Sequence, residues 1–507
     1  MQQIRLRPEQ SIEIIPDLVR KKLRKRDLVM KNITIARESI DARDKNNIRR
    51  VFTVDFEANM KLDLPEAPDL SYEYPEGGVP EKRPVVVGFG PCGMFCALAL
   101  ARMGMAPIVL ERGKPVSERA KDVAKTRAGG APDPESNVQF GEGGAGTFSD
   151  GKLTTGIKDR RIRKVLEDLV LFGADKEILY KQKPHIGTDR LRDIVTALRE
   201  ETERLGGEVR FGARVDRITT VTGGCMSDAP GEKRIRSVVL ADGDEIITDD
   251  IVFAIGHSAR DTFRMLDEAG LEMTQKPFSI GMRIEHPQRV IDRAQYGDAD
   301  LSALLGPAEY KLAYHTSAGR GVYTFCMCPG GEVILASSAE GEIVTNGMSY
   351  QARSGKHANS ALLTDVRPED FGSDDLFAGV DFQKKYEEAA FEVSAAAGAG
   401  YVIPRVRWGE FEGSPAAGCL PSFARESMKE AMPVLGRKLK SFDDPRAMMY
   451  AVETRSSSPV RILRDERYMA NVTGIYPAGE GAGYAGGIMS SAVDGMRIAE
   501  SIRERYR

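Results

Sequence analysis

The sequence predicts an α/β protein built around a parallel β-sheet, and three neighbouring segments carry this prediction. An apolar run at 84–87 ends in glycines. A helix-like pattern follows at 91–104, and a second apolar run follows at 107–111. A strand, a helix and a strand in this order are typical of a βαβ unit, whose two strands are parallel. The 507 residues are enough for about three domains of ordinary size.

The composition excludes several classes of protein. Charged residues make up 29% of the chain and apolar residues 41%, which is ordinary for a soluble globular protein. No apolar run approaches the roughly 18–20 residues of a membrane span, and the N-terminus lacks the apolar core of a signal peptide. The cysteines are too few and too scattered for a disulfide scaffold; they are Cys92, Cys96, Cys225, Cys326, Cys328 and Cys419. We therefore expect a cytoplasmic protein without a membrane span.

Residues 1–75 are predicted to form a small α/β domain followed by a linker. Apolar residues recur at helical spacing around Pro16, and proline is favoured at the first turn of a helix. Residues 32–44 and 49–58 have the composition of strands. Residues 62–83 are rich in Pro, Glu and Gly, which is typical of a linker.

This N-terminal domain is basic. Residues 1–50 contain 14 Lys and Arg against 7 Asp and Glu, a net charge of +7, whereas the whole chain has −3. The basic run at 20–26 is of the kind that binds nucleic acids or acidic partners, or that forms the solvated face of an amphipathic helix. Aromatic residues that would stack on bases are scarce here. We favour the solvated face and do not expect a nucleic acid partner.

The pattern G-x-G-x-x-G occupies the turn between the first predicted strand and its helix. Gly88 allows a tight turn, Gly90 lets the backbone approach a pyrophosphate, and Gly93 permits close packing of helix and strand. The helix N-terminus adds free N–H groups and a partial positive charge. Glu111 ends the second strand, where a carboxylate accepts from ribose hydroxyls and repels a 2′-phosphate. These residues predict a dinucleotide site and argue against NADP in it.

Two further matches to the pattern lack its context. The segment 141–146 is followed by neither a helix pattern nor a distal acid, and 481–486 precedes a helix but no second strand. We therefore do not interpret either as a dinucleotide motif. Without a second nucleotide-binding unit, NAD(P)H would serve only as a transient electron donor.

Two later segments favour FAD over NAD as the dinucleotide. The segment 474–480 resembles the second FAD fingerprint of the glutathione-reductase-like flavoproteins, in which the final carboxylate, here Glu480, binds the ribityl chain. AIG at 254–256 resembles their middle motif, and their layout implies that the last helix, beginning near 486–488, points its N-terminus at the flavin. The N–H groups of the loop 141–152 would bond the polar edge of the flavin or a phosphate, and the alternative is a structural Ω-type loop. The predicted FAD contacts are Gly88, Gly90, Pro91, Cys92, Gly93, Glu111, Arg112, Gly141, Gly143, Gly144, Gly146, Lys152, Ala254, Gly256, Gly479, Glu480, Gly486, Gly487 and Ile488.

Longer strings of residues resemble one particular family of flavoproteins. They are QFGEGGAGTFSDGKL at 139–153, PHIGTDRL at 184–191, FSIGMRIEHPQ at 278–288, YTFCMCPGGEV at 323–333, NGMS at 346–349, VETRSSSPVRI at 452–462 and PAGEGAGYAGGIMSSAVDG at 477–495. By these strings the chain resembles, over nearly its whole length, the uncharacterised bacterial FAD-dependent dehydrogenase or NAD(P)/FAD-dependent oxidoreductase family. Ser456 stands where threonine is expected, which keeps the hydroxyl.

The resemblance implies an α/β fold with a Rossmann-type, glutathione-reductase-like FAD-binding domain that is discontinuous in sequence. Its two parts are expected at 83–260 and 441–507. An inserted α+β substrate or cap domain is expected at 261–440, and the small N-terminal α/β domain precedes all three. The reactions of the family are mostly unassigned, so the resemblance implies no substrate.

Residues that would act on a substrate are harder to choose from the sequence. Lys152 would stabilise reduced flavin or an anionic substrate. Arg455 and Arg461 would either clamp an anionic substrate or an FAD phosphate, or pair with surface acids. His286 has the near-neutral pKa range of an acid–base group. The catalytic candidates are Lys152, His286, Cys328 and Arg455, and the further polar candidates are Arg283, Glu285, His315, Arg353, Asn359 and Arg461.

Cys326 and Cys328 form a C-x-C pair. We expect no disulfide between them, because the geometry of such a pair on a regular strand is poor. No other Cys or His lies at zinc spacing, so we expect no metal site. Buried structural thiols are the favoured interpretation, and one thiol facing the substrate pocket is the alternative.

These observations together predict an FAD-dependent oxidoreductase, a dehydrogenase or reductase, that transfers a hydride via flavin N5 to or from a small-molecule substrate. One alternative is a flavin-dependent RNA-modifying enzyme that uses the basic N-terminal domain. Another is a non-catalytic FAD-binding sensor. The sequence specifies neither the substrate nor the oligomeric state.

Overall fold

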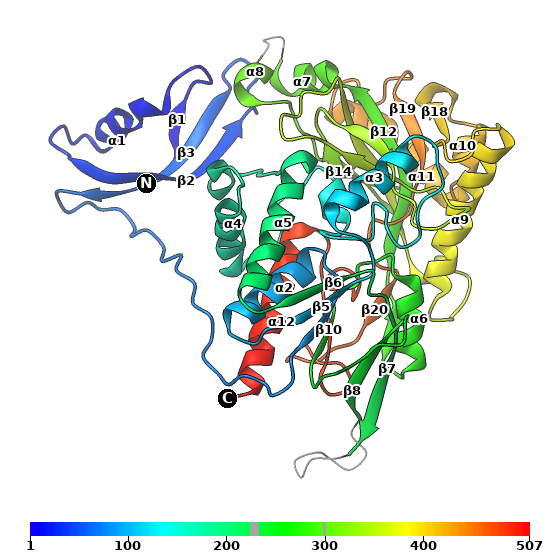
Figure 1. Cartoon of the computed structure of the whole chain (residues 1–507). Helices are drawn as coiled ribbons and strands as arrows, with labels where there is room; N and C mark the ends of the chain where they lie inside the picture. Colours follow the sequence, from blue (N-terminus) through cyan, green and yellow to red (C-terminus); the bar gives the residue numbers. More distant parts are fainter. Residues whose placement is uncertain (224–232, 298–300) are drawn as a thin grey trace.

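A parallel sheet of five strands forms the centre of one half of the molecule (Figure 1). Its strands, in spatial order, are β21 (Ile475–Pro477), β10 (Ile251–Phe253), β4 (Val85–Val87), β5 (Ile108–Glu111) and β6 (Glu208–Phe211). The predicted βαβ unit is confirmed, because α2 (Pro91–Arg102) connects β4 to the parallel strand β5. The computed structural model describes residues 1–223, 233–297 and 301–507, so Cys225 lies outside the described residues.

Both faces of the parallel sheet are covered. On one face, an apolar core joins the sheet to α2, α4 (Arg161–Leu171), α5 (Thr188–Arg204) and α12 (Ile488–Arg505). On the other face, a second core joins it to β7 (Val215–Thr222), β8 (Lys233–Leu240), β9 (Glu245–Ile247) and α6 (Arg260–Glu268). Strands buried on both faces have no solvent side, which explains the unbroken apolar run of β4.

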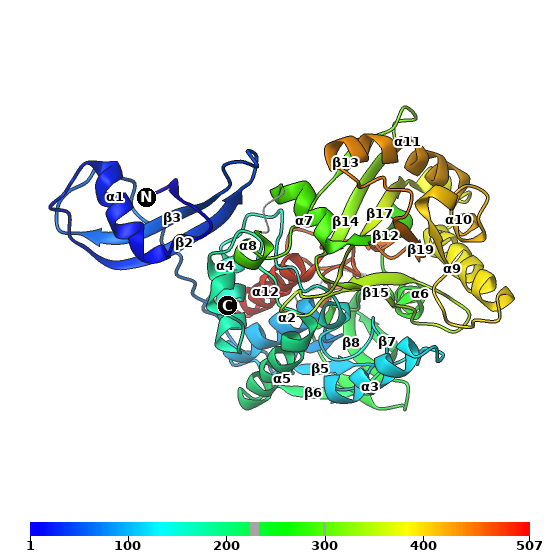
Figure 2. The ribbon, with the colours of Figure 1, turned by 90° about the horizontal axis from the view of Figure 1, so that it is seen from above.

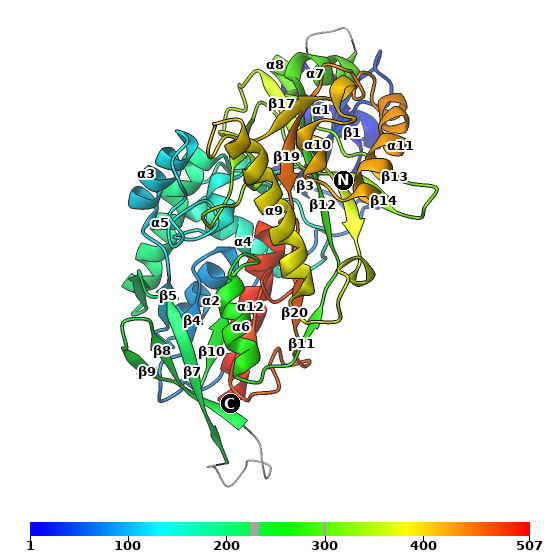
Figure 3. The same cartoon turned by 90° about the vertical axis from the view of Figure 1, so that its right-hand side faces the viewer.

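The segment between β10 and β21 builds an antiparallel sheet of six strands. In spatial order these are β13 (Ala313–His315), β14 (Gly321–Cys328), β17 (His357–Val366), β12 (Phe278–Pro287), β19 (Met448–Glu453) and β18 (Arg405–Arg407). Its helices are α7 (Gln288–Tyr296), α8 (Ser302–Leu305), α9 (Ala378–Ala396), α10 (Pro415–Gly418) and α11 (Ser422–Lys438). Figure 3 shows this half stacked on the end of the parallel sheet, with α9 running toward α6.

One short helix and two pairs of short strands connect the two halves. They are α3 (Val116–Arg127), the pair β11 (Met273–Gln275) and β20 (Val460–Ile462), and the pair β15 (Glu332–Leu335) and β16 (Thr345–Met348). The strand β19 departs from the expected boundary at 441, because it pairs with β12 inside the antiparallel sheet. Its buried Met449, Ala451 and Val452 belong to the apolar core of that sheet. The chain therefore returns to the parallel sheet only at β21.

The N-terminal domain stands apart from the two larger halves (Figure 2). It contains β1 (Ile4–Leu6), α1 (Ile15–Leu23), β2 (Met30–Asp41) and β3 (Arg49–Ala58), with the strands in the order β1-β3-β2. The predicted helix and both predicted strands are confirmed. The backbone of Glu38 bonds the backbone of Tyr180 at 2.8 Å and of Gln182 at 2.9 Å, which attaches β2 to the body.

The segment 62–83 is described throughout and contains no helix or strand, as expected of a linker. The segment lies beside the C-terminal end of α12, where the N–H of Gly78 donates to the carbonyl of Tyr506 at 2.8 Å. Among all described residues, no helix is both long and apolar enough to cross a membrane. Across the same ranges, no group of three or more His, Cys, Asp or Glu side chains is placed to hold a metal ion.

Candidate functional site

One elongated cavity begins where three strands of the parallel sheet end. Gly88, Gly256 and Gly479 follow β4, β10 and β21, and all three have positive φ, at 94°, 72° and 70°. Residues with a Cβ rarely adopt this conformation, so the turns at this edge require glycine. Crevices at the carboxyl ends of parallel strands are the usual ligand sites of open α/β sheets.

The glycine-rich segments that are far apart in sequence touch each other along this cavity. A Cβ on Gly144 would lie 2.9 Å from the Cα of Gly90, and a Cβ on Gly146 would lie 3.2 Å from the side chain of Ile488. A Cβ on Gly481 would overlap the carbonyl oxygen of Gly256. The four loops therefore approach one another at backbone contact distance, which side chains would prevent.

Two helices begin at the cavity wall. The helix α2 starts after Gly90 and α12 starts after Gly487, and neither N-terminus has a side-chain cap. The first N–H groups of a helix lack partners within the helix and carry partial positive charge. Both helix starts are therefore suited to phosphate or to another electron-rich group.

Glu111 holds two of the glycine loops together. Its buried carboxylate accepts from the N–H of Phe89 at 2.8 Å, of Gly113 at 2.8 Å and of Gly141 at 3.0 Å. The sequence predicts this carboxylate as an acceptor for ribose, and it does line the cavity, but it is also bonded to the backbone of three segments. Sequence spacing showed the strand end but not the loops that fold onto it.

Arg112 is also fixed by protein contacts. Its guanidinium pairs with Glu135 at 2.7 Å and with Asp261 at 2.9 Å, and it lies 4.4 Å from the ring centroid of Phe140. Arg112 and Phe140 both line the cavity. This stack therefore forms a stiff wall beside Glu111.

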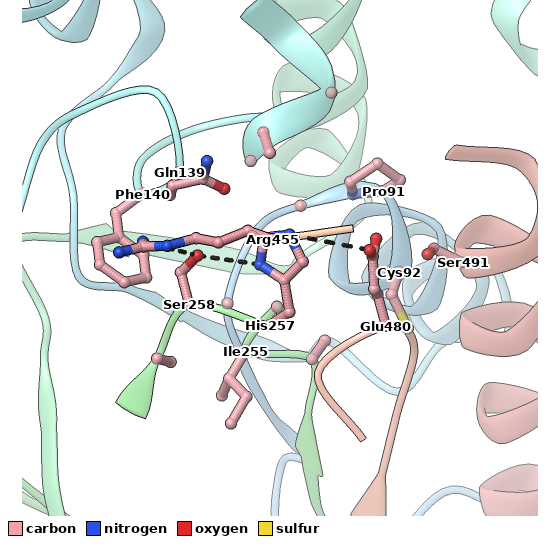
Figure 4. Close-up of a pocket in the computed structure, with 18 of the residues that line it drawn as sticks. Pro91, Cys92, Gln139, Phe140, Ile255, His257, Ser258, Arg455, Glu480 and Ser491 are labelled. Carbon is pink, nitrogen blue, oxygen red and sulfur yellow. Dashed lines mark hydrogen bonds and ion pairs between the residues drawn. The ribbon is translucent and has the colours of Figure 1, made fainter. Parts of the chain in front are cut away.

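Glu480 extends into the cavity from the end of β21 (Figure 4). Its carboxylate lies 3.9 Å from the Nε2 atom of His257, and no donor of the described chain makes a hydrogen bond to it. Burial raises the pKa of Glu480 to about 7, against the opposing charge of Lys276. A carboxylate in this position has acceptor capacity for a ligand that carries hydroxyl groups.

His257 was not among the residues chosen from the sequence. It immediately follows the 254–256 motif, and its Nδ1 atom lies 2.9 Å from the hydroxyl of Ser258. Burial, and then the charge of Arg455, lower its pKa to about 4, so the imidazole is neutral at physiological pH. The position of His257 directly after the 254–256 motif, at the end of a strand, is the sequence feature that could have identified it as a cavity residue.

Of the 19 predicted FAD contacts, 15 line the cavity. The four that do not are Gly93, Gly141, Gly143 and Gly479. A Cβ on Gly93 would overlap the carbonyl oxygen of Gly88, so this glycine serves the packing of α2 on β4. Gly141, Gly143 and Gly479 have positive φ and shape the loops behind the wall.

Two of the catalytic candidates line the cavity, and both are engaged by the protein. The Lys152 ammonium donates to the carbonyl of Met327. The Arg455 guanidinium bonds the carboxylates of Glu342 and Glu387 and the hydroxyls of Ser258 and Ser338. Arg455 therefore pairs with acids, as its second interpretation expects, but these acids are buried rather than on the surface, and the pairing joins α9 to the cavity wall.

The other two catalytic candidates lie away from the cavity lining. His286 is 1% exposed, and its Nε2 atom lies 2.8 Å from the carbonyl of Phe442 in the core of the antiparallel sheet. Burial lowers its pKa. Cys328 is fully buried behind Cys326, which does line the cavity.

The further polar candidates scatter across the antiparallel half. Arg283 is fully buried and pairs with Glu453 at 3.0 Å and with Asn359 at 3.2 Å. Arg353 pairs with Asp150 and Glu309, Glu285 accepts from the hydroxyl of Tyr450, and Arg461 donates to the carbonyl of Gly483. His315 is exposed on β13. Among these residues, Arg283 and Asn359 lie directly behind the cavity wall formed by Glu453 and Cys326.

Comparison with known proteins places the chain among its relatives. A protein of Clostridium beijerinckii described as uncharacterised is 42% identical over 536 residues, which cover 99% of this chain and 98% of the relative. A family described as "FAD-dependent protein, C-terminal domain-like" matches residues 277–417. The chain belongs to this uncharacterised FAD-dependent family. A separate domain of unknown function matches residues 1–57.

Solved structures are more distant. An L-proline dehydrogenase from P. horikoshii is 13% identical with a TM-score of 0.39, and the match covers 85% of this chain and 95% of the dehydrogenase. A probable FAD-dependent monooxygenase from Pseudomonas aeruginosa is 14% identical with a TM-score of 0.32, and the match covers 83% and 84%.

Proposed function

We propose that the protein is an FAD-dependent oxidoreductase that transfers a hydride via flavin N5 to or from a small-molecule substrate. One observation carries this proposal: the glycine-rich segments and both helix starts meet along a single cavity that also receives the Glu480 carboxylate. The membership of an FAD-dependent family agrees with it.

The residues of the cavity fit FAD at each of its polar groups. The turn 88–93 and the start of α2 would hold the pyrophosphate, because they offer close backbone approach and free N–H groups. Glu480 would accept from the ribityl hydroxyls, since its oxygens make no hydrogen bond to described donors. Glu111 would face the adenosine end. Once bound, FAD supplies hydride and electron transfer, while the protein supplies orientation and electrostatics.

The reacting end of the cavity is assigned to the second glycine loop and α12. Gly146 and Ile488 are in contact there, and Lys152 fixes the adjacent strand through Met327. The N–H groups at the start of α12 favour negative charge at this point. The opposite wall carries Phe325, Cys326 and Asn346, and we assign it to the substrate.

The glutathione-reductase-like assignment is supported by the order of the elements. The chain leaves the parallel sheet after β6, forms the antiparallel β7–β9 sheet, and returns at β10. The antiparallel half is inserted between β10 and β21. This order agrees with a discontinuous FAD-binding domain that carries an inserted substrate domain.

The proposal is tested by purification and anaerobic reduction. We expect the purified protein to show a flavin absorbance spectrum, or to acquire one on addition of FAD. NADH, NADPH and candidate small molecules would then be screened for bleaching of that spectrum. Because the sequence has no second dinucleotide motif, we expect any reduction by a nicotinamide to show weak saturation, as for a transient donor. A protein that takes up no flavin would contradict the proposal.

A further inference from the structure

The two cysteines of the C-x-C pair lie at an irregular point of β14. The pairing of β14 with β17 changes register between Phe325 and Cys328. Cys326 has a φ of 43°, in the left-handed region that non-glycine residues rarely occupy. Both thiols are free in the structure, and the regular strand on which the expectation of poor disulfide geometry rested is absent at this bulge. A bulge of this kind redirects side chains and recurs beside active sites.

The two cysteines lie next to each other at this bulge and are unequal. The Sγ atom of Cys328 lies 3.3 Å from the carbonyl oxygen of Cys326. Cys326 lines the cavity, whereas Cys328 is fully buried behind it. One thiol is therefore accessible to a small molecule, and the other is accessible only through the first.

Two cations lie beside this pair. The Arg283 guanidinium donates to the carbonyl of Cys326 at 2.9 Å, and the Lys152 ammonium donates to the carbonyl of Met327. The neighbouring Cys328 thiol, and then the charges of Arg283 and Lys152, lower the pKa of Cys326 although burial opposes this. The pKa of Cys328 is raised. An accessible outer sulfur that ionises more readily than a buried inner one is the arrangement of an attacking and a resolving cysteine.

Gly347 of β16 leaves the space that the pair occupies. A Cβ at this position would lie 2.7 Å from the Sγ atom of Cys328, and it would also overlap the Arg283 guanidinium. The inner thiol, the guanidinium and Asn359 all converge on this glycine. The cluster is therefore packed around the sulfur atom from the side opposite the cavity.

Of the other described cysteines, Cys92 also lines the cavity, but none of them lies at an irregular point of a strand. Cys92 and Cys96 are buried on α2, and Cys419 is buried between α10 and α11. Burial raises the pKa of all three thiols. They behave as apolar packing residues, which sets them apart from the pair on β14.

We propose that Cys326 and Cys328 form a reversible dithiol–disulfide pair on the wall of the cavity. With a small-molecule disulfide as oxidant, the Cys326 thiolate attacks one of its sulfurs, forms a mixed disulfide and releases one thiolate. The Cys328 sulfur then attacks that of Cys326, which forms the internal disulfide and releases a second thiolate. That thiolate takes up the Cys328 proton. The cysteine pair loses two electrons and the oxidant gains them.

The test is a redox titration read by mass spectrometry. Purified protein is equilibrated with mixtures of reduced and oxidised glutathione, quenched with acid, alkylated with iodoacetamide after denaturation, and cut with trypsin. Cleavage after Arg320 and Arg353 gives the peptide 321–353, which contains Cys326 and Cys328 and no other cysteine. We expect a fully alkylated peptide under reducing conditions, and an unalkylated peptide lighter by two hydrogen atoms under oxidising conditions.

Single substitutions assign the two roles. In Cys328→Ser, we expect Cys326 to stop at the mixed disulfide with glutathione, because the resolving thiol is missing. In Cys326→Ser, Cys328 should remain reduced because it is buried. The matched control Cys419→Ser should titrate like the unchanged protein, since Cys419 is equally buried but lies between α10 and α11 and does not line the cavity.

The proposal is overturned if peptide 321–353 of the unchanged protein stays fully alkylated at every glutathione ratio. It is also overturned if Cys328 rather than Cys326 carries the glutathione adduct. The titration of the unchanged protein tests for the disulfide between Cys326 and Cys328 even where a cysteine variant fails to fold. Because the readout needs no flavin, it separates this inference from the proposed oxidoreductase function, which flavin uptake tests.

Discussion

The two walls of the cavity are made in different ways. The wall on the parallel-sheet side is largely backbone: it consists of glycine turns after β4, β10 and β21 and the free starts of two helices. The wall on the antiparallel side consists of side chains from separate strands, with Cys326 on β14, Glu453 on β19 and Arg283 on β12 behind them. The first wall is specified by short local motifs. The second exists only after distant strands have paired.

The largest expected loss of stability comes from a substitution behind the side-chain wall. Arg283→Met would leave the Glu453 carboxylate buried without its cation, and removing one partner of a buried pair costs about 3–5 kcal/mol. We expect the free energy of unfolding, measured by urea denaturation, to fall by this amount. Arg446→Met is the control, because the Arg446 side chain is 85% exposed and its loss should cost less than about 0.5 kcal/mol. Equal losses in the two variants would contradict the account.

At the backbone wall, the largest expected effect is that of Gly93→Ala. The added Cβ would overlap the carbonyl oxygen of Gly88, so α2 must move away from β4. Overpacking of this kind costs roughly 2–3 kcal/mol, which thermal or urea unfolding would measure. Gly418→Ala is the matched control, because nothing lies within 4 Å of a Cβ at that helical position. A variant at 93 that is as stable as the control would show that the close packing is unnecessary.

The sequence was sufficient for the first wall and insufficient for the second. Glycine spacing predicted the turn at Gly88, which depends on neighbours in sequence. The resemblance to flavoproteins, rather than spacing, led us to expect the start of the last helix at the same cofactor as this turn. Neither predicted that Glu111 ties the loops together, since those bonds come from loops folded onto the strand end. His286 has a suitable chemistry but packs in the core, whereas His257 lies at the cavity directly after the 254–256 motif.

A smaller effect concerns the junction of the two walls, at Glu480. Burial raises the pKa of Glu480 from an ordinary 4.5 to about 7. Below pH 4.5, Glu480 is protonated in both the folded and the unfolded chain. As the pH rises from 4.5 through 7, the unfolded chain ionises first, so the folded state loses stability relative to it. Without FAD, Glu480→Gln should therefore be more stable than the unchanged protein by roughly 1–2 kcal/mol above pH 7 and equal to it near pH 4.5. Urea denaturation across this pH range measures the difference.

The same variant also tests whether Glu480 contributes to the binding of FAD. Glutamine offers one carbonyl oxygen in place of two charged carboxylate oxygens, so we expect Glu480→Gln to bind FAD more weakly while it folds more stably. A variant that gains stability and keeps full FAD affinity would show that Glu480 does not contact the cofactor.

The central claim is that the glycine turns form one FAD site, and Gly90→Ala tests it most directly. A Cβ on Gly90 has room within the protein, because its nearest neighbour would be the Cα of Gly144 at 3.7 Å, but it would occupy the place of close approach to the pyrophosphate. Titration of flavin-free protein with FAD should give a Kd weakened by about tenfold or more relative to the unchanged protein and to Gly418→Ala, with thermal stability unchanged. Unaltered FAD affinity in Gly90→Ala, or no binding of FAD by the unchanged protein, would contradict the account.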